Sequence, residues 1–168
     1  MRVRGAGPVV IGLVAVLLLA SCGDDDDEKT LSEQELVTQS NQICSGAGQR
    51  IEQEAKTRFG SSQDVGSAQQ LEQFATKVVV PEYDKAVDKL EDLKPPTEEA
   101  GVFDDFLSET RKALDDDVKQ DPVGSLSQVS AQDPFAKANR QAQRIGLNEC
   151  ASLSQKIRAS ADRSPGKR

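Results

Sequence analysis

The sequence predicts an all-α domain, an antiparallel up-down four-helix bundle with a second helix kinked at a proline and one disulfide. Three observations favour this fold. Apolar residues recur at spacings of three and four along four stretches of the chain, as they do in amphipathic helices. Short connections containing Gly or Pro separate the stretches, which favours antiparallel neighbours. The β-branched run at residues 78–80 has no second strand to pair with, so we assign it to a helix.

The first residues of the chain have the pattern of an export signal. Arg2 and Arg4 precede an apolar run at residues 9–20, and a basic start followed by such a run is typical of a signal peptide. A membrane-spanning helix needs roughly 20 apolar residues, so this run is short for one.

The apolar run ends in Leu19-Ala20-Ser21-Cys22. This motif resembles the lipobox of bacterial lipoproteins, and the resemblance implies cleavage before Cys22 and a diacylglycerol on its sulfur. Two alternatives remain, an ordinary cleaved signal that releases a secreted protein and an uncleaved anchor. In either alternative Cys22 is an unpaired thiol.

Cleavage before Cys22 leaves a mature chain of 147 residues, enough for one domain. We expect a signal peptide at 1–21, an acidic flexible tether at 22–30, a helical domain at 31–159 and a disordered tail at 160–168. The net charge changes from −7 to −9 because both signal arginines are lost. This balance argues against binding nucleic acid and against peripheral binding to anionic lipid. A covalent lipid is therefore expected to supply the membrane affinity.

Residues 23–30, GDDDDEKT, carry a run of like charges that repels itself and stays extended. A calcium site is the alternative. However, known calcium loops place their ligands at alternate positions around a glycine turn, and this run has neither feature.

The first helix is predicted at residues 32–59. Ser32 and Glu35 fit a capping box, with Leu31 and Leu36 at the two staple positions. The apolar stripe that follows is Leu36, Ser40, Ile43, Ala47, Ile51, Ala55 and Phe59.

The second helix is predicted to begin after Ser67, which opens a further capping box, and to end before Pro95. Pro81 lies in its interior. Because an interior proline removes a hydrogen bond and clashes with the preceding turn, we expect a kink or break near Val80. Tyr83 is assigned to the core with its hydroxyl at the surface, and the lining of a groove beside Pro81 is the alternative.

The third helix is predicted to start with Thr97 as N-cap and to reach Val118. The run Asp115–Asp117 spans too much of the helix circumference for one site, so we interpret it as a solvated face. Asp121 and Pro122 end this helix and begin a short turn through residue 129.

The fourth helix is predicted to start with Asp133 as N-cap and Pro134 at its first position. Gly146 suits the left-handed position that ends a helix, with Leu147 as the hydrophobic contact after it. A terminal helix is expected from about Asn148, and the polar tail is expected to fray.

The remaining cysteines predict one disulfide. If Cys22 carries lipid, Cys44 and Cys150 are left, and they permit a single intramolecular pairing. Export places the domain where disulfides persist. Two free buried thiols are the alternative.

A series of short motifs in this order resembles the small two-cysteine helical lipoproteins of actinobacteria. The motifs lie at residues 41–44, 80–81, 93–96, 133–135 and 145–150. The resemblance covers roughly residues 36–151. It implies a disulfide-linked α-helical domain outside the membrane, and it implies no reaction.

Residues that carry catalysis are few. The chain has no His, the commonest general base and metal ligand, and no glycine loop for phosphate. We therefore expect no enzyme, no catalytic residue, no cofactor and no metal site. The expected function is a non-catalytic interaction or scaffold domain, anchored by lipid on the extracytoplasmic side of the cell membrane, with a possible protein partner of basic or mixed charge.

Two other functions stay open. One is a carrier that holds a small apolar or lipid ligand between the helices, where they part at Pro81. The other is a cell-wall hydrolase that uses a pair of carboxylates, since 28 acidic residues make chance pairs inevitable.

Overall fold

Every regular element of the described residues, which are 30–59, 68–126 and 133–161, is helical in this computed structural model of the chain. The all-α prediction is confirmed. The elements in chain order are α1 (Glu33–Phe59), α2 (Ala68–Phe74), the π-helical η1 (Ala75–Val79), α3 (Val80–Glu91), α4 (Thr97–Lys112), the π-helical η2 (Ala113–Val118), α5 (Pro122–Leu126), α6 (Ala136–Arg144) and α7 (Asn148–Ala161). The predicted four-helix bundle is not confirmed, because α5 and α7 are separate helices in addition to the predicted four.

The start of α1 has the predicted capping box. The Glu35 carboxylate accepts hydrogen bonds from the backbone N–H and the hydroxyl of Ser32, at 2.9 and 2.7 Å, and the Ser32 hydroxyl accepts one from the Glu35 N–H at 3.3 Å. Leu36, the staple residue of the first turn, is fully buried. The Leu31 N–H donates to the Lys94 carbonyl at 2.8 Å. This bond holds the beginning of the domain against the α3–α4 connection.

The second rod of the bundle consists of α2, η1 and α3, and Pro81 lies in its interior. The predicted break is absent, since the backbone stays helical at Val79 (φ −63°, ψ −55°) and at Val80 (φ −58°, ψ −52°). Instead, the turn immediately before the proline is π-helical. A wider turn accommodates a residue that donates no N–H and pushes away the preceding carbonyl. The second predicted capping box begins at Ser67, outside the described residues.

The third rod of the bundle consists of α4 and η2. Its predicted N-cap, Thr97, is instead the first residue of α4. Pro96 takes the N-cap position with an extended backbone (ψ 152°), and its carbonyl accepts from the N–H groups of Glu99 and Ala100, each at 3.0 Å. The rod continues through η2 to Val118, as expected. The predicted turn at Asp121 is the helix α5, whose Gly124 N–H donates to the Asp121 carboxylate at 2.9 Å.

The predicted N-cap at Asp133 is also wrong, because α6 begins at Ala136 with Phe135 as its N-cap. The Asp133 carboxylate instead accepts a hydrogen bond from the Phe135 N–H at 3.0 Å, and the backbone carbonyl of Asp133 accepts one from the Ala136 N–H at 3.0 Å. A turn therefore precedes the helix.

The turn between α6 and α7 is the one predicted. Gly146 has a positive φ of 76°, which glycine adopts without steric cost. The Leu147 N–H donates to Ala142 O at 2.9 Å and the Gly146 N–H to Gln143 O at 3.2 Å, the bond pair of a Schellman motif. Leu147 is fully buried, and α7 starts at the next residue.

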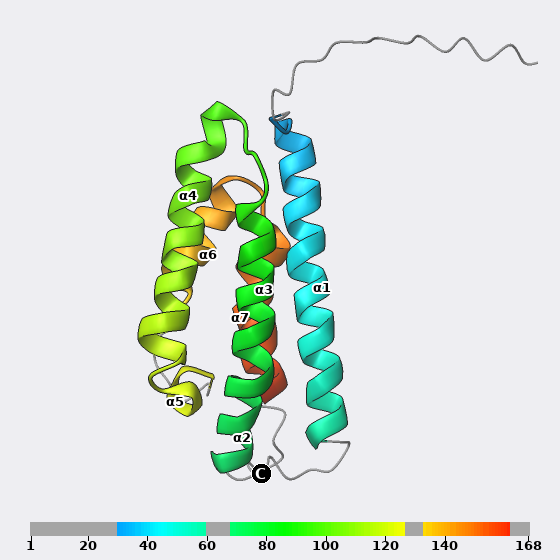
Figure 1. Cartoon of the computed structure of the whole chain (residues 1–168), viewed down its shortest axis with the longest axis vertical. Coiled ribbons are helices and arrows are strands. Elements are labelled where there is room, and N and C mark those ends of the chain that lie inside the picture. Colours follow the sequence, from blue (N-terminus) through cyan, green and yellow to red (C-terminus); the bar gives the residue numbers. More distant parts are fainter. Residues whose placement is uncertain (1–29, 60–67, 127–132, 162–168) are drawn as a thin grey trace, which may run out of the picture.

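Figure 1 shows α1, the second rod and α4 side by side with alternating directions, and α6 and α7 behind them. The core between these layers is apolar, and its largest fully buried side chains include Phe74, Phe103, Leu36, Ile51 and Leu90. The chain enters this domain at one end of α1, and α2, α5 and the end of α7 lie at the opposite end (Figure 1).

Candidate functional site

The predicted disulfide between Cys44 and Cys150 is confirmed. It joins α1 to α7 with a Cα–Cα distance of 5.0 Å, within the ordinary range for a bridge. Both cysteines are buried, with 3% and 6% of their surface exposed. The sulfurs therefore serve the packing of α1 on α7 and are not available to a substrate.

Asn41 fixes the same two helices one turn away from the disulfide. Its side-chain N–H donates to Gly146 O at 3.2 Å, and its side-chain oxygen accepts the Glu149 N–H at 2.9 Å. Asn41 thus caps the start of α7 from a distant part of the sequence, a role that sequence reasoning missed because local capping rules consider near neighbours only.

A pocket of about 320 Å³ lies between α1 and α7 beyond the disulfide. Its floor includes Ile51, Leu153 and Ile157, all buried. Glu149 and Lys156 form an ion pair of 2.6 Å at its rim.

Tyr83 belongs to the core, as predicted, and does not line the groove beside Pro81, but its hydroxyl is buried and not at the surface as expected. Its ring stacks on Phe135 with centroids 4.8 Å apart, and 5% of the residue is exposed. Burial, together with the charge of Asp133, raises the pKa of the Tyr83 phenol well above its ordinary value.

Asp133 also accepts hydrogen bonds from Asn139 at 3.1 Å and from the Ser154 hydroxyl at 3.2 Å. These bonds hold the turn before α6 against α7. The cavity beside this cluster measures about 20 Å³.

A groove of about 400 Å³ does lie beside Pro81, between α1 and the second rod. We call it the Pro81 groove. Four of its lining side chains are cationic and two are anionic, although the whole chain has a net charge of −7. Its lining residues are Arg50, Gln53, Glu54, Arg58, Lys77, Val78, Pro81, Glu82 and Lys85.

Glu82 is the central anion of the Pro81 groove. It pairs with Arg50 at 2.5 Å and with Lys85 at 2.8 Å, and 14% of its side chain is exposed. Hydrogen bonds from Arg50 and then from Lys85 hold the pKa of the Glu82 carboxyl below its ordinary value. Glu82 is therefore held ionised, which suits it to electrostatic pairing and not to the delivery of a proton at neutral pH.

The other charges of the groove are held less tightly. Arg58 pairs with Glu54 at 3.4 Å, and 40% and 50% of these side chains are exposed. Lys77, in η1, has no ion-pair or hydrogen-bond partner among the described residues.

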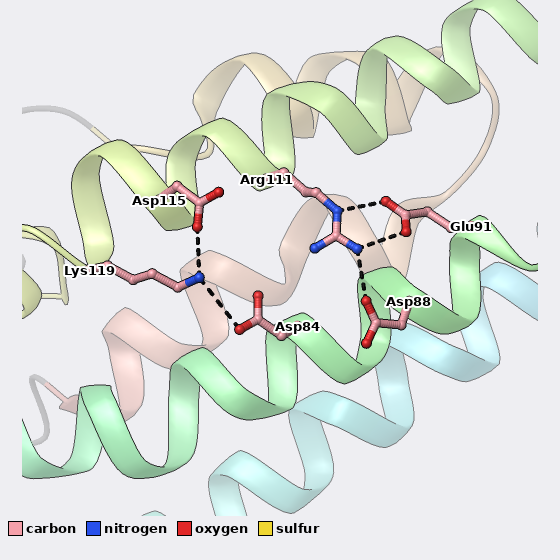
Figure 2. A network of polar contacts seen from close by, with 6 residues as sticks. All are labelled: Asp84, Asp88, Glu91, Arg111, Asp115 and Lys119. Atoms are coloured by element: carbon pink, nitrogen blue, oxygen red, sulfur yellow. Dashed lines mark hydrogen bonds and ion pairs between the residues drawn. The ribbon is translucent and has the colours of Figure 1, made fainter.

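Acidic side chains of α3 face the next rod in an ion-pair network (Figure 2). Arg111 binds Glu91 through two nitrogens, at 2.6 and 2.7 Å, and Asp88 at 2.8 Å. Lys119 bridges Asp115 at 2.7 Å and Asp84 at 3.6 Å. The Arg111 guanidinium lowers the pKa of the Glu91 carboxyl.

The same network raises the pKa of two cations. Glu91 and, to a smaller extent, Asp88 raise the pKa of Arg111. Asp115 raises the pKa of Lys119. All three aspartates of the run Asp115–Asp117 are exposed, as predicted for a solvated face.

A further pocket, of about 820 Å³, lies between α4–η2 and α5–α6 and has an acidic balance. Its charged lining residues are Glu109, Lys112, Asp116, Asp117, Asp121, Asp133, Lys137 and Arg140. Within the described ranges, no group of three or more His, Cys, Asp or Glu is placed to hold a metal ion.

The export signal, Cys22 and residues 23–29 of the tether lie outside the described residues. Among the helices that the structure describes, none has the length and apolar character to cross a membrane. No family model, curated protein or solved structure matches the chain.

Proposed function

We propose that this chain is an exported lipoprotein of the two-cysteine actinobacterial kind, anchored through a diacylglycerol on Cys22 to the outer face of the cell membrane. The lipobox supports the anchor, and the disulfide supports an extracytoplasmic location because such bonds persist there. In this proposal residues 1–21 are removed, 22–30 form the tether, 31–159 form the domain and 160–168 form the tail. The up-down frame of the domain consists of α1, the second rod, α4 and α6, to which α7 is added.

The domain works by binding and not by catalysis in this proposal. The Pro81 groove is the observation that carries it. The groove has a positive balance in an acidic chain and is built on two rigid helices that one protein core supports. One side of it is formed by the π-helical η1, and such segments are frequent at functional sites. The tether would raise the concentration of this surface near the membrane.

The tether joins the domain at the end opposite to the Pro81 groove. Arg50 lies 17 residues after the first residue of α1, which corresponds to about 25 Å along the helix. The lipid therefore does not compete for the groove, and a partner approaches it from the side of the domain.

Photocrosslinking in intact cells tests this proposal. A photoreactive residue at the exposed groove position Gln53 is expected to capture a specific partner, whereas the same residue at Ser108, exposed on α4, is not. The capture is expected to fall when Cys22→Ala removes the anchor. Equal capture at both positions, or turnover of an envelope substrate that depends on one Asp or Glu, contradicts the proposal.

The pocket between α1 and α7 favours a second candidate function, the transport of a small apolar ligand. Its volume of about 320 Å³ and its floor of Ile51, Leu153 and Ile157 fit such a ligand. The ligand would then lie beside the disulfide and not between helices that part at Pro81. Native mass spectrometry of the protein taken from its own membrane is expected to show a bound apolar molecule if this function is correct.

A further inference from the structure

We infer that the Pro81 groove binds an extended anionic polymer with repeated phosphodiester groups. This inference rests on the proposed binding function and names the chemistry of its ligand. The first support is the placement of four cations around one groove of about 400 Å³, which exceeds the needs of a single phosphate.

The cations lie at two levels of the groove. Arg50 and Arg58 are eight positions apart on α1, and Lys77 and Lys85 are eight apart on the second rod. Eight helical residues span about 12 Å. Because the two rods are antiparallel (Figure 1), Arg58 lies at the level of Lys77, and Arg50 at the level of Lys85. Each end of the groove thus holds one arginine and one lysine, which suits a ligand with anionic groups at intervals.

The Phe59–Phe74 ring contact of 5.2 Å fixes this register at one end of the groove. The pairing of Arg50 with Glu82 at 2.5 Å fixes it at the other. Ring packing therefore fixes one level, and an ion pair to the largely buried Glu82 fixes the other.

The two levels differ in how free their cations are. Lys77 has no partner among the described residues, and the Arg58–Glu54 pair is long and exposed, so it contributes little stability. At the other level Glu82 occupies both Arg50 and Lys85. An incoming anion binds freely at the Lys77 level and competes with Glu82 at the other level, so Glu82 acts as an internal competitor of the ligand.

The chemistry of the partner follows from charge and position. Phosphodiesters stay ionised at every physiological pH, and the arginine fork matches phosphate oxygens. An anionic membrane surface and double-stranded nucleic acid are both disfavoured, because the net charge of −9 that cleavage leaves repels these wide charged surfaces as the domain approaches. A thin chain avoids most of this repulsion, since it enters the groove without bringing a wide charged surface near the acidic faces.

The test measures binding of a synthetic poly(glycerol phosphate) oligomer to the full mature chain, purified in a neutral detergent, by calorimetry at low salt. Lys77→Ala is expected to weaken binding about fivefold, the upper end for an exposed ion pair. Glu82→Gln is expected to tighten it by a similar factor, because it frees Arg50 and Lys85. Lys89→Ala removes an exposed lysine of α3 outside the groove and is expected to change nothing.

The opposite signs separate binding from folding, because a loss of structure weakens binding in both variants. Weaker binding by Glu82→Gln, or no effect of Lys77→Ala, overturns the inference. Tighter binding of a poly-aspartate peptide, or binding only to vesicles with anionic phospholipid, overturns the phosphodiester assignment. If the oligomer does not bind while Gln53 still captures a partner in cells, this inference fails and the proposed function stands. If the oligomer does not bind and Gln53 captures no partner in cells, the proposed function is wrong as well.

Discussion

Removal of the Cys44–Cys150 disulfide is expected to lower the free energy of unfolding by about 4.8 kcal/mol. The perturbation is the double substitution Cys44→Ala and Cys150→Ala, made with Cys22→Ala so that no third thiol interferes. The bridge closes a loop across 106 positions, and the chain-entropy model gives this figure for a loop of that length. Domains of this size have unfolding free energies of about 5–15 kcal/mol, so the loss is a large share.

Urea unfolding followed by far-ultraviolet circular dichroism measures the loss. The slope of the unfolding free energy against urea is also expected to rise, because an unfolded chain without the cross-link exposes more surface. Reduction of the cysteine-containing protein is the control, since it opens the loop and leaves both side chains in place. A loss below about 2 kcal/mol in both proteins refutes the entropic reasoning. Two alkylatable thiols in unreduced protein refute the bond itself.

The remaining predictions concern ion pairs and helix packing, and urea unfolding measures each of them. Arg111→Ala is expected to cost about 0.5–1 kcal/mol at low salt and less at high salt, whereas the exposed Lys112→Ala is expected to cost nothing; equal losses contradict the role of the network. The pKa of Glu91 lies below its ordinary value of 4.5, so its ion pair with Arg111 stabilises the folded state above that pH and ceases to do so as the pH falls. Arg111→Ala is therefore expected to reduce the loss of stability in acid. Gly101→Ala is expected to add about 0.5–1 kcal/mol, because its added Cβ meets no atom within 4 Å. Gly48→Ala is expected to lack this gain, because its Cβ would lie 3.0 Å from a Leu153 methyl; the same gain at both glycines contradicts the packing argument.

Sequence reasoning was most successful where a helix end is fixed by residues close in the chain. The Ser32–Glu35 box and the Gly146–Leu147 turn were both predicted, and each depends on hydrogen bonds that span only a few residues. It failed by one or two positions where a proline is involved. Pro96 takes the cap assigned to Thr97, and the Asp133 side chain caps a turn that precedes α6. The two shifts have opposite directions, since α4 begins one residue earlier than predicted, after the extended Pro96, and α6 begins two residues later, after the turn at Pro134.

The arrangement of α7 was beyond local patterns. Its stripe of Leu153 and Ile157 predicted a terminal helix, and the predicted Cys44–Cys150 pairing placed the start of that helix against α1, but no local pattern set its direction. The structure pairs the two helices through the disulfide, through Asn41 and through the close approach at Gly48, where Leu153 leaves little room for a side chain. The disulfide was predictable because two cysteines allow one pairing. The direction of α7 relative to α1 follows from three contacts that are all distant in sequence.

The charge of the Pro81 groove differs in sign from the net charge of the chain. The composition is acidic, yet four of the charged side chains that line the groove are cationic and two are anionic. Along the chain, Glu52 and Glu54 lie between its two arginines, and Glu82 and Asp84 lie between its two lysines, so neither segment is strongly basic alone. The positive balance arises because the antiparallel register turns the cationic positions of two helices toward one another, while Asp84 pairs with Lys119 on the next rod. The sign of the groove is therefore a property of helix rotation and register, which tertiary packing sets.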